Sequence, residues 1–198
     1  MKKIVLIVSL SAIFTYGFNI KNIYLKSYNY EKMSDFSDAI KVLIPLYKKS
    51  PNQYFINLRL AWLFFLDEKY KNAIKHYKMA LIAEPNSIEA NLGLIKSYLN
   101  LGDANSAIRI GNVILKIDLY NFYGNYNLIL ALKEKGEYKQ ALKLTRKMLS
   151  LYPTSTIYLE QLANLLSKKD IKGAKKVYQY ILILDPNNVT AKQYLFGK

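Results

Sequence analysis

The most restrictive feature of this sequence is an internal repeat with a period of 34 residues. Four alanines follow one another at this interval, and each opens a similar phrase of alanine, an aliphatic residue and a basic residue. A fixed period of this length indicates one supersecondary unit copied along the chain, which buries its apolar face only by stacking on its neighbours. The sequence therefore predicts a stacked array. The alanines are Ala39, Ala73, Ala107 and Ala141.

The positions around these alanines repeat too, and the pattern resembles the tetratricopeptide repeat, a helix-turn-helix unit of 34 residues. The second unit matches the family pattern best, through Leu60, Ala61, Phe64, Ala73, Tyr77, Ala80 and Pro85. The resemblance implies an all-α fold, a right-handed superhelical array of antiparallel helix pairs. Alanine recurs because two helices cross closely only where a side chain is small.

The repeat divides the chain into five units and two ends. The units are 20–53, 54–87, 88–121, 122–155 and 156–188, and the fifth is one residue short before its second helix. Residues 189–198 resemble the start of a further first helix. Because repeat arrays commonly end in an atypical terminal unit, this segment is predicted to be a capping helix.

The N-terminus resembles an export signal. Met1-Lys2-Lys3 precedes a largely apolar run from Ile4 to Phe14, and Thr15-Tyr16-Gly17 offers small residues three and one before a cut after Gly17. The run is short for a membrane span, which needs about 20 apolar residues. Three interpretations stay open: a cleaved signal peptide at 1–17, an uncleaved membrane anchor, and a buried first helix. We expect an exported, periplasmic or cell-envelope protein.

The residues that usually carry catalysis are scarce in this sequence. There is no cysteine and one histidine, His76, which has no serine or acid at helical partner spacing. No phosphate-binding glycine loop, zinc spacing or nucleophile elbow occurs in the sequence. We therefore predict a non-enzymatic protein without a cofactor, and a structural or solvent-exposed role for His76.

The resemblance also implies a concave groove, lined in the family by positions 2, 5, 9 and 12 of each first helix. The predicted partner-binding residues are Tyr24, Tyr28, Phe55, Leu58, Arg59, Trp62, Phe65, Leu92, Lys96, Leu99, Tyr123, Tyr126 and Leu130. Cations suited to an acidic peptide are scattered one to a unit, which argues against a carboxylate clamp. The predicted partner is a protein or peptide segment bound by apolar contacts. The alternative is that these side chains pack among themselves.

The chain is strongly basic, with 29 Lys and Arg against 14 Asp and Glu and a net charge of +15. Position 22 is basic in every unit, which predicts a basic convex face formed by Lys41, Lys75, Arg109, Lys143 and Lys176. An ordinary solvated surface is one interpretation, and an anionic membrane surface or acidic polymer as partner is the other. Nucleic acid is disfavoured by the export signal and by groove aromatics that are not interleaved with basic residues.

Overall, the sequence predicts a scaffold or adaptor that binds a protein segment in an apolar groove. By analogy with family members in bacterial envelopes, we expect a role in cell-envelope complex assembly. The alternative is a membrane-anchored protein that applies its basic face to anionic lipid or acidic polymer.

Overall fold

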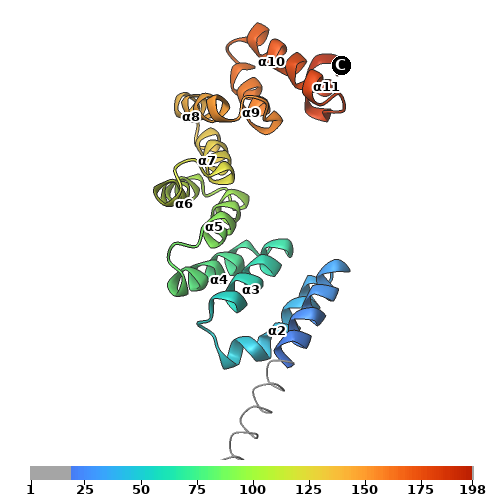
Figure 1. Ribbon diagram of the computed structural model, residues 1–198, viewed down its shortest axis with the longest axis vertical. Helices are drawn as coiled ribbons and strands as arrows, with labels where there is room; N and C mark the ends of the chain where they lie inside the picture. Colours follow the sequence, from blue (N-terminus) through green and yellow to red (C-terminus); the bar gives the residue numbers. More distant parts are fainter. Residues whose placement is uncertain (1–18, 198) are drawn as a thin grey trace, which may run out of the picture. The chain divides into compact units, whose positions relative to one another are not determined.

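The structure is a computed structural model that describes residues 19–197, and all regular secondary structure within these residues is helical (Figure 1). A first helical segment occupies 19–32. It is followed by α2 (Phe36–Lys49), α3 (Tyr54–Leu66), α4 (Tyr70–Ala83), α5 (Ile88–Asn100), α6 (Ala104–Ile117), α7 (Phe122–Glu134), α8 (Tyr138–Leu151), α9 (Thr156–Leu166), α10 (Ile171–Leu184) and α11 (Val189–Phe196). The predicted all-α class is confirmed.

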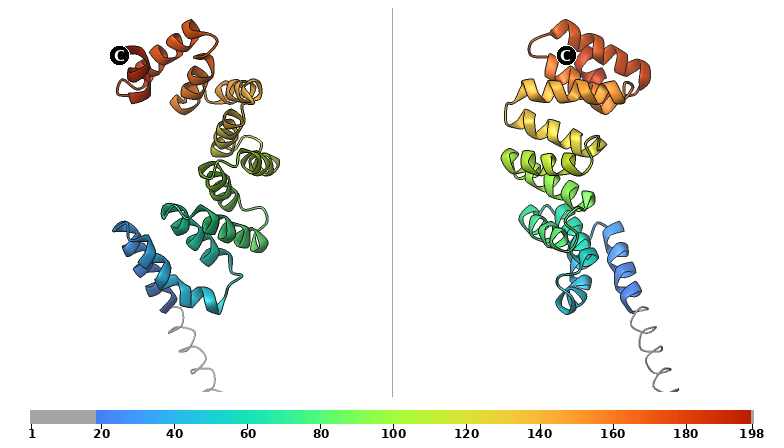
Figure 2. Two further views of the ribbon diagram at one scale, coloured as in Figure 1. Left: turned by 180° about the vertical axis from the view of Figure 1, so that it is seen from behind. Right: turned by 60° about the vertical axis from the view of Figure 1, so that its left-hand side comes forward.

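Neighbouring helices pack in sequence from α2 to α4 and again from α6 to α11, for example α3 on α4, α7 on α8 and α9 on α10 (Figure 2). The chain divides into two compact units, Met1–Ser97 and Tyr98–Lys198, and the division falls inside α5. The first unit contains the segment 19–32, α2, α3, α4 and most of α5. The second contains the rest of the helices, of which α11 occupies most of the predicted capping segment.

The alanines of the 34-residue period lie at the centres of the helix contacts. Ala39, Ala73, Ala107 and Ala141 are all fully buried on second helices. In the first unit, Ala39 shares an apolar core with side chains of α2 and α3, which are Ile40, Leu43, Leu46, Ile56, Leu60 and Leu63. A methyl side chain at the crossing lets the two helices approach closely, which is the packing reason expected from the sequence.

The turn inside each of the first four repeats contains one residue in the left-handed conformation. These residues are Ser34, Glu68, Gly102 and Gly136, with φ angles of 59°, 55°, 71° and 83°. They follow one another at 34-residue intervals. A left-handed residue just after a helix ends it and satisfies its last carbonyls, and glycine adopts this conformation without steric cost. The turn is thus a repeated device that directs each second helix back along the first.

A buried asparagine repeats at the fourth position of three first helices and holds the turn between repeats. The Asn57 Nδ2 donates to the carbonyls of Pro51 and Gln53 at 2.7 and 2.8 Å. Asn125 does the same with the carbonyls of Leu119 and Asn121 at 3.1 and 2.9 Å. Asn91 donates to the Ser87 carbonyl at 2.9 Å. The bonds to Pro51 and Leu119 satisfy carbonyls of the turn, and the bonds to Gln53, Ser87 and Asn121 reach carbonyls that also accept the backbone N–H of the same asparagine.

None of the helices within residues 19–197 is long and apolar enough to cross a bilayer. The predicted signal peptide or anchor at 1–17 lies outside the described residues.

Candidate functional site: an aromatic pocket in the first unit

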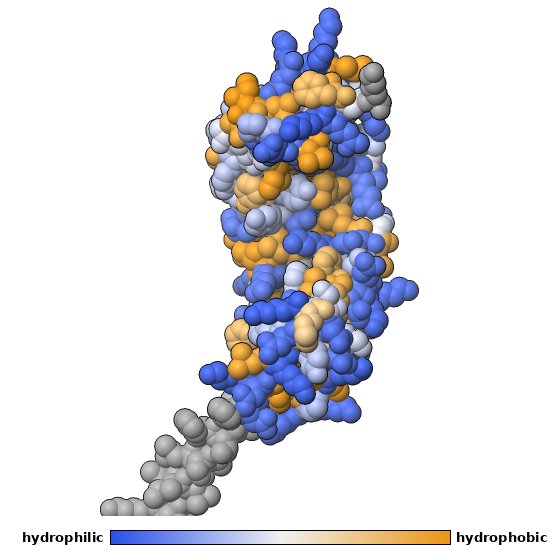
Figure 3. Space-filling model, turned by 90° about the vertical axis from the view of Figure 1, so that its right-hand side faces the viewer, coloured by the Kyte–Doolittle hydropathy of each residue, from blue (hydrophilic) through white to orange (hydrophobic). Residues whose placement is uncertain are grey.

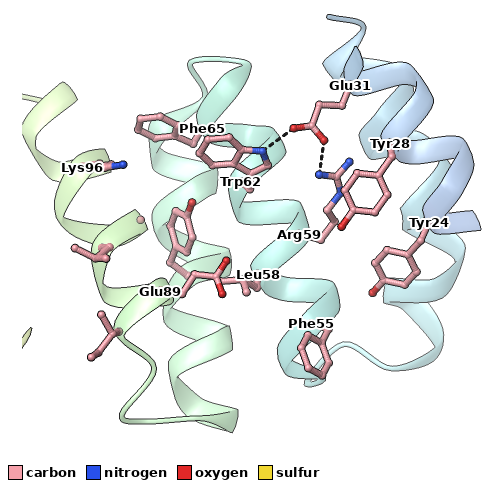
Figure 4. A pocket seen from close by; sticks show the side chains of 14 residues that line it. Tyr24, Tyr28, Glu31, Phe55, Leu58, Arg59, Trp62, Phe65, Glu89 and Lys96 are labelled. Atoms are coloured by element: carbon pink, nitrogen blue, oxygen red, sulfur yellow. Dashed lines mark hydrogen bonds and ion pairs between the residues drawn. The ribbon is translucent and has the colours of Figure 1, made fainter. Parts of the chain in front are cut away.

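The first unit contains a pocket of about 750 Å³ between the segment 19–32, α3 and α5 (Figure 4). Nine of the predicted groove residues line it: Tyr24, Tyr28, Phe55, Leu58, Arg59, Trp62, Phe65, Leu92 and Lys96. The structure adds Glu31, Tyr77, Ile88, Glu89 and Gly93. A volume in this range is typical of sites that enclose a ligand or a few side chains of a partner.

One face of α3 forms the centre of the pocket. Phe55, Leu58, Trp62 and Phe65 stand three or four residues apart, a spacing that places them on one side of a helix. The rings of Trp62 and Phe65 are stacked, with centroids 5.9 Å apart. Trp62 is 39% exposed and Phe55 is 71% exposed. These aromatic side chains are therefore accessible in the free protein rather than enclosed in the core.

An ionic network joins the segment 19–32 to α3 at one wall of the pocket. The Glu31 carboxylate accepts a hydrogen bond from the Trp62 indole Nε1 at 2.7 Å and forms an ion pair with Arg59 (Figure 4). The Arg59 guanidinium also donates to Ser27 Oγ at 3.3 Å and lies over the Tyr28 ring, 3.8 Å from its centroid. Glu31 thus binds both central polar groups of this wall, the Trp62 indole N–H and the Arg59 guanidinium.

The burial of Arg59 bears on whether it can serve as a cation for a partner. Its side chain is only 7% exposed. A buried guanidinium is stable when it is paired and hydrogen-bonded, and here Glu31, Ser27 and the Tyr28 ring provide those partners. The sequence indicated Arg59 as a groove cation, and the structure places it at the pocket with its charge already neutralised by Glu31.

The opposite wall is formed by α5 with help from α4. Gly93 makes room for the Tyr77 side chain, because a Cβ atom at this position would lie 2.1 Å from Tyr77 Cζ. Burial, and secondarily the Glu89 charge, raise the pKa of the Tyr77 hydroxyl, which stays neutral at physiological pH. Glu89 and Lys96, both exposed, stand at the two ends of this wall.

The single histidine lies in the core of the first unit. His76 is 7% exposed, and its Nδ1 is 3.0 Å from the Asn57 Oδ1. Its ring is stacked on Phe64 and meets Tyr47 edge-on. Burial, followed by the Lys75 charge, lowers the pKa of His76 to about 4, so the ring is neutral at pH 7. Of the two roles expected for His76, the structure shows the structural one.

The other four predicted groove residues belong to the second unit and are not among the lining residues of the pocket. They are Leu99, Tyr123, Tyr126 and Leu130. Tyr123 is exposed, whereas Tyr126 packs against the core cluster that contains Leu128 and the fully buried Tyr158.

The residues predicted to form the basic convex face lie on the second helices, whereas most of the predicted groove residues lie on first helices. All five are exposed, each on the second helix of its repeat: Lys41, Lys75, Arg109, Lys143 and Lys176.

Within residues 19–197, no group of three or more acidic, histidine or cysteine side chains is arranged to hold a metal ion.

Two acidic pocket residues were missed by sequence reasoning, although the signal for them was present. Glu31 is at position 12 of the first 34-residue repeat and Glu89 at position 2 of the third repeat, both of which are groove positions in the family pattern. Tyr77 and Gly93 carry no such signal, since their role depends on the contact between α4 and α5.

The helix pairs, the 34-residue register and the accessible first-helix face together define a repeat protein of the tetratricopeptide class. Comparison with protein families agrees: two tetratricopeptide repeat models match residues 64–119 and 124–155. The chain is a tetratricopeptide repeat protein. A search of curated proteins found no match to the sequence.

Solved structures with a similar fold include several tetratricopeptide repeat proteins. One from Parabacteroides merdae has a TM-score of 0.80 and 18% identity, over 89% of this chain and 71% of that one. MamA from Desulfovibrio magneticus has a TM-score of 0.77 and 16% identity, over 86% and 97% of the two chains. A thermophilic protein from Thermus thermophilus gives 0.67 and 16%, over 88% and 96%. At these identities the likeness concerns the fold.

Proposed function

We propose that this protein is a non-enzymatic adaptor that binds a segment of a partner protein in the aromatic pocket. The tetratricopeptide fold is a scaffold for protein–protein interaction, and proteins of this family are generally not enzymes. The observation that carries the proposal is the accessible aromatic face of α3. Exposed aromatic clusters mark interaction sites, and aromatic anchors that become buried dominate the energy of interfaces.

Trp62 is the side chain on which binding is expected to depend most. It is the only tryptophan of the chain, it lies at the centre of the pocket, and its indole is held in place by Glu31. Burying its exposed surface under a partner removes apolar area from water while its hydrogen bond stays intact. Trp62→Ala should therefore weaken partner binding by about 2 kcal/mol, or roughly 30-fold.

Site-specific photocrosslinking tests the proposal in the native cell. Phe55 is replaced by p-benzoylphenylalanine, which keeps an aromatic ring at an exposed position of the pocket. A matched variant carries the same crosslinker at Lys143, which is exposed on a second helix outside the pocket. We expect a discrete crosslinked partner from position 55, absent from position 143, and lost in the Trp62→Ala background.

Folding of the variants is checked separately. If Trp62→Ala lowers thermal stability but leaves capture per folded molecule unchanged, Trp62 is a core residue and the pocket is not the binding site. Equal capture from positions 55 and 143 would also contradict the proposal.

For the cellular location, we propose that the protein is exported and acts in assembly of a cell-envelope complex. The basis is the charged and then apolar N-terminal sequence, Met1 to Gly17. Fusion of residues 1–17 to a reporter that is active only after export tests this. A reporter that remains inactive with the wild-type leader, while a known leader activates it, would refute the location.

The alternative function is contact with anionic lipid or acidic polymer through the basic residues of the second helices. It is favoured by the exposure of all five position-22 cations. Figure 3 shows another face of the molecule, on which patches of hydrophobic side chains lie between hydrophilic ones. Vesicles with and without phosphatidylglycerol test this alternative. Such binding should collapse as salt rises from about 0.05 to 0.5 M, whereas binding in the apolar pocket should persist.

A further inference from the structure

The pocket contains two carboxylates, and they differ in how they are used. Both oxygens of Glu31 are occupied, one by the Trp62 indole and the other by Arg59. Glu89 extends from α5 and is exposed (Figure 4). Within residues 19–197 its carboxylate forms no hydrogen bond or ion pair. Glu89 therefore brings a negative charge to the pocket that its own chain does not neutralise.

The rest of the lining suits the stem and charge of a basic side chain. Six aromatic rings border the pocket, those of Tyr24, Tyr28, Phe55, Trp62, Phe65 and Tyr77. Aromatic faces attract lysine and arginine heads, and they also provide apolar surface along which the aliphatic stems lie. The nearest native example is Arg59, whose guanidinium already stacks on the Tyr28 ring. A second cation beside Glu89 would meet the same combination of ring and carboxylate.

The other charged groups of the pocket limit where such a cation can bind. Arg59 is paired with Glu31, so that this wall is close to neutral. Lys96 follows Glu89 by seven residues, which is about 10.5 Å along the helix. A basic side chain is therefore favoured at the Glu89 end of α5.

We infer that the pocket selects a partner segment in which a lysine or arginine is flanked by apolar residues, and that Glu89 pairs with this cation. The inference rests on the proposed function. It specifies that the bound segment is basic, whereas the basic charge of the whole protein would suggest an acidic partner. One turn of helix fills about 420 Å³ at a diameter of 10 Å, so the pocket volume corresponds to about six residues of a helical segment.

Glu89 also has a local role that the test must separate from recognition. It stands in the first turn of α5, where the helix dipole favours an acid. Loss of that interaction would change stability in every assay that depends on folding. A change in which peptides are bound would not follow from it.

A selection experiment reads out this preference directly. A phage library of random 12-residue peptides is selected on the full-length protein, and peptides that bind Trp62→Ala equally well are discarded. The retained peptides should be enriched in lysine or arginine next to leucine, phenylalanine or tryptophan. Selection on Glu89→Gln should lose the basic enrichment, and selection on Glu89→Lys should shift it to aspartate and glutamate.

A selected basic peptide is then measured by the fluorescence of Trp62. Its affinity should fall about two- to fivefold in Glu89→Gln, the range of partly exposed ion pairs, and further in Glu89→Lys. Asp38→Asn is the matched control, since Asp38 is a first-turn acid of α2 outside the pocket. It should leave both the peptide composition and the affinity unchanged.

The outcomes separate this inference from the proposed function. Peptides that depend on Trp62 but show no basic enrichment, or keep it in Glu89→Lys, would overturn the inference and leave the adaptor function standing. A Glu89→Gln variant that melts earlier and selects the same peptides would assign Glu89 to the helix dipole alone. Failure to select any peptide that depends on Trp62 would overturn both.

Discussion

Removal of the Glu31 carboxylate is the sharpest test of how the pocket is built. In Glu31→Ala, Arg59 loses its ion-pair partner and the Trp62 indole loses its acceptor at 2.7 Å. Arg59 keeps Ser27 Oγ at 3.3 Å and the Tyr28 ring. Because its side chain is only 7% exposed, water cannot fully replace the lost carboxylate.

The magnitude follows from the burial of the two partners. Breaking a fully buried pair costs about 3–5 kcal/mol, and a hydrogen bond to a charged group contributes about 1.5–3 kcal/mol. Glu31 is 22% exposed, so solvent offsets part of the loss. We therefore expect Glu31→Ala to lower the free energy of unfolding by about 2–3 kcal/mol, and Glu31→Gln, which keeps one acceptor, by about half of that.

Urea unfolding followed by circular dichroism measures the global effect. Since terminal repeats open separately from the rest of an array, hydrogen exchange of residues 20–32 is measured in parallel. A double-mutant cycle with Arg59→Met isolates the pair, and the expected coupling is about 1 kcal/mol or more. If Glu31→Ala changes neither the unfolding free energy by more than about 0.5 kcal/mol nor the exchange of this segment, the network does not hold the pocket wall.

Three further predictions concern the array and its pH dependence. Ala107→Leu should destabilise by about 1–3 kcal/mol, because Ala107 is fully buried at a helix crossing, whereas Asn105→Leu on the exposed side of α6 should change thermal stability little. Gly136→Ala should lower the free energy of unfolding in urea by about 1–2 kcal/mol, because its φ of 83° suits glycine; no neighbour lies near the added Cβ, so the cost is that of the backbone alone. Glu68→Gly should raise the free energy of unfolding by about 0.5–1 kcal/mol, because Glu68 has the same left-handed conformation. The pKa of His76 is lowered to about 4 in the folded protein. Between pH 6.5 and 4 the unfolded chain therefore binds a proton that the folded chain does not, and the free energy of unfolding decreases as the pH is lowered. The wild type should lose about 1–2 kcal/mol more than His76→Gln between pH 7 and 5, and equal losses would contradict the burial argument.

Much of the fold follows from signals that are local and repeated. The alanine of the second helix recurs every 34 residues in four repeats, and Gly102 and Gly136 mark the turn in two of them, so each unit reinforces the assignment of the others. Helix position alone also indicates which side chains share a face, because residues three and four apart lie on one side of a helix. This rule is sufficient to bring Phe55, Leu58, Trp62 and Phe65 together from the sequence.

The pairing of side chains across helices is what the tertiary structure decided. Arg59 could bind a partner's acid or an acid of its own chain, and the deciding residue, Glu31, is 28 positions away. The neutral His76 in the core and the Tyr77 side chain that passes over Gly93 are further cases of this kind. Periodicity determines which face of a helix a residue occupies, but the distance between helices and the rotamers of both partners determine what it touches. Those quantities arise only when the repeats pack.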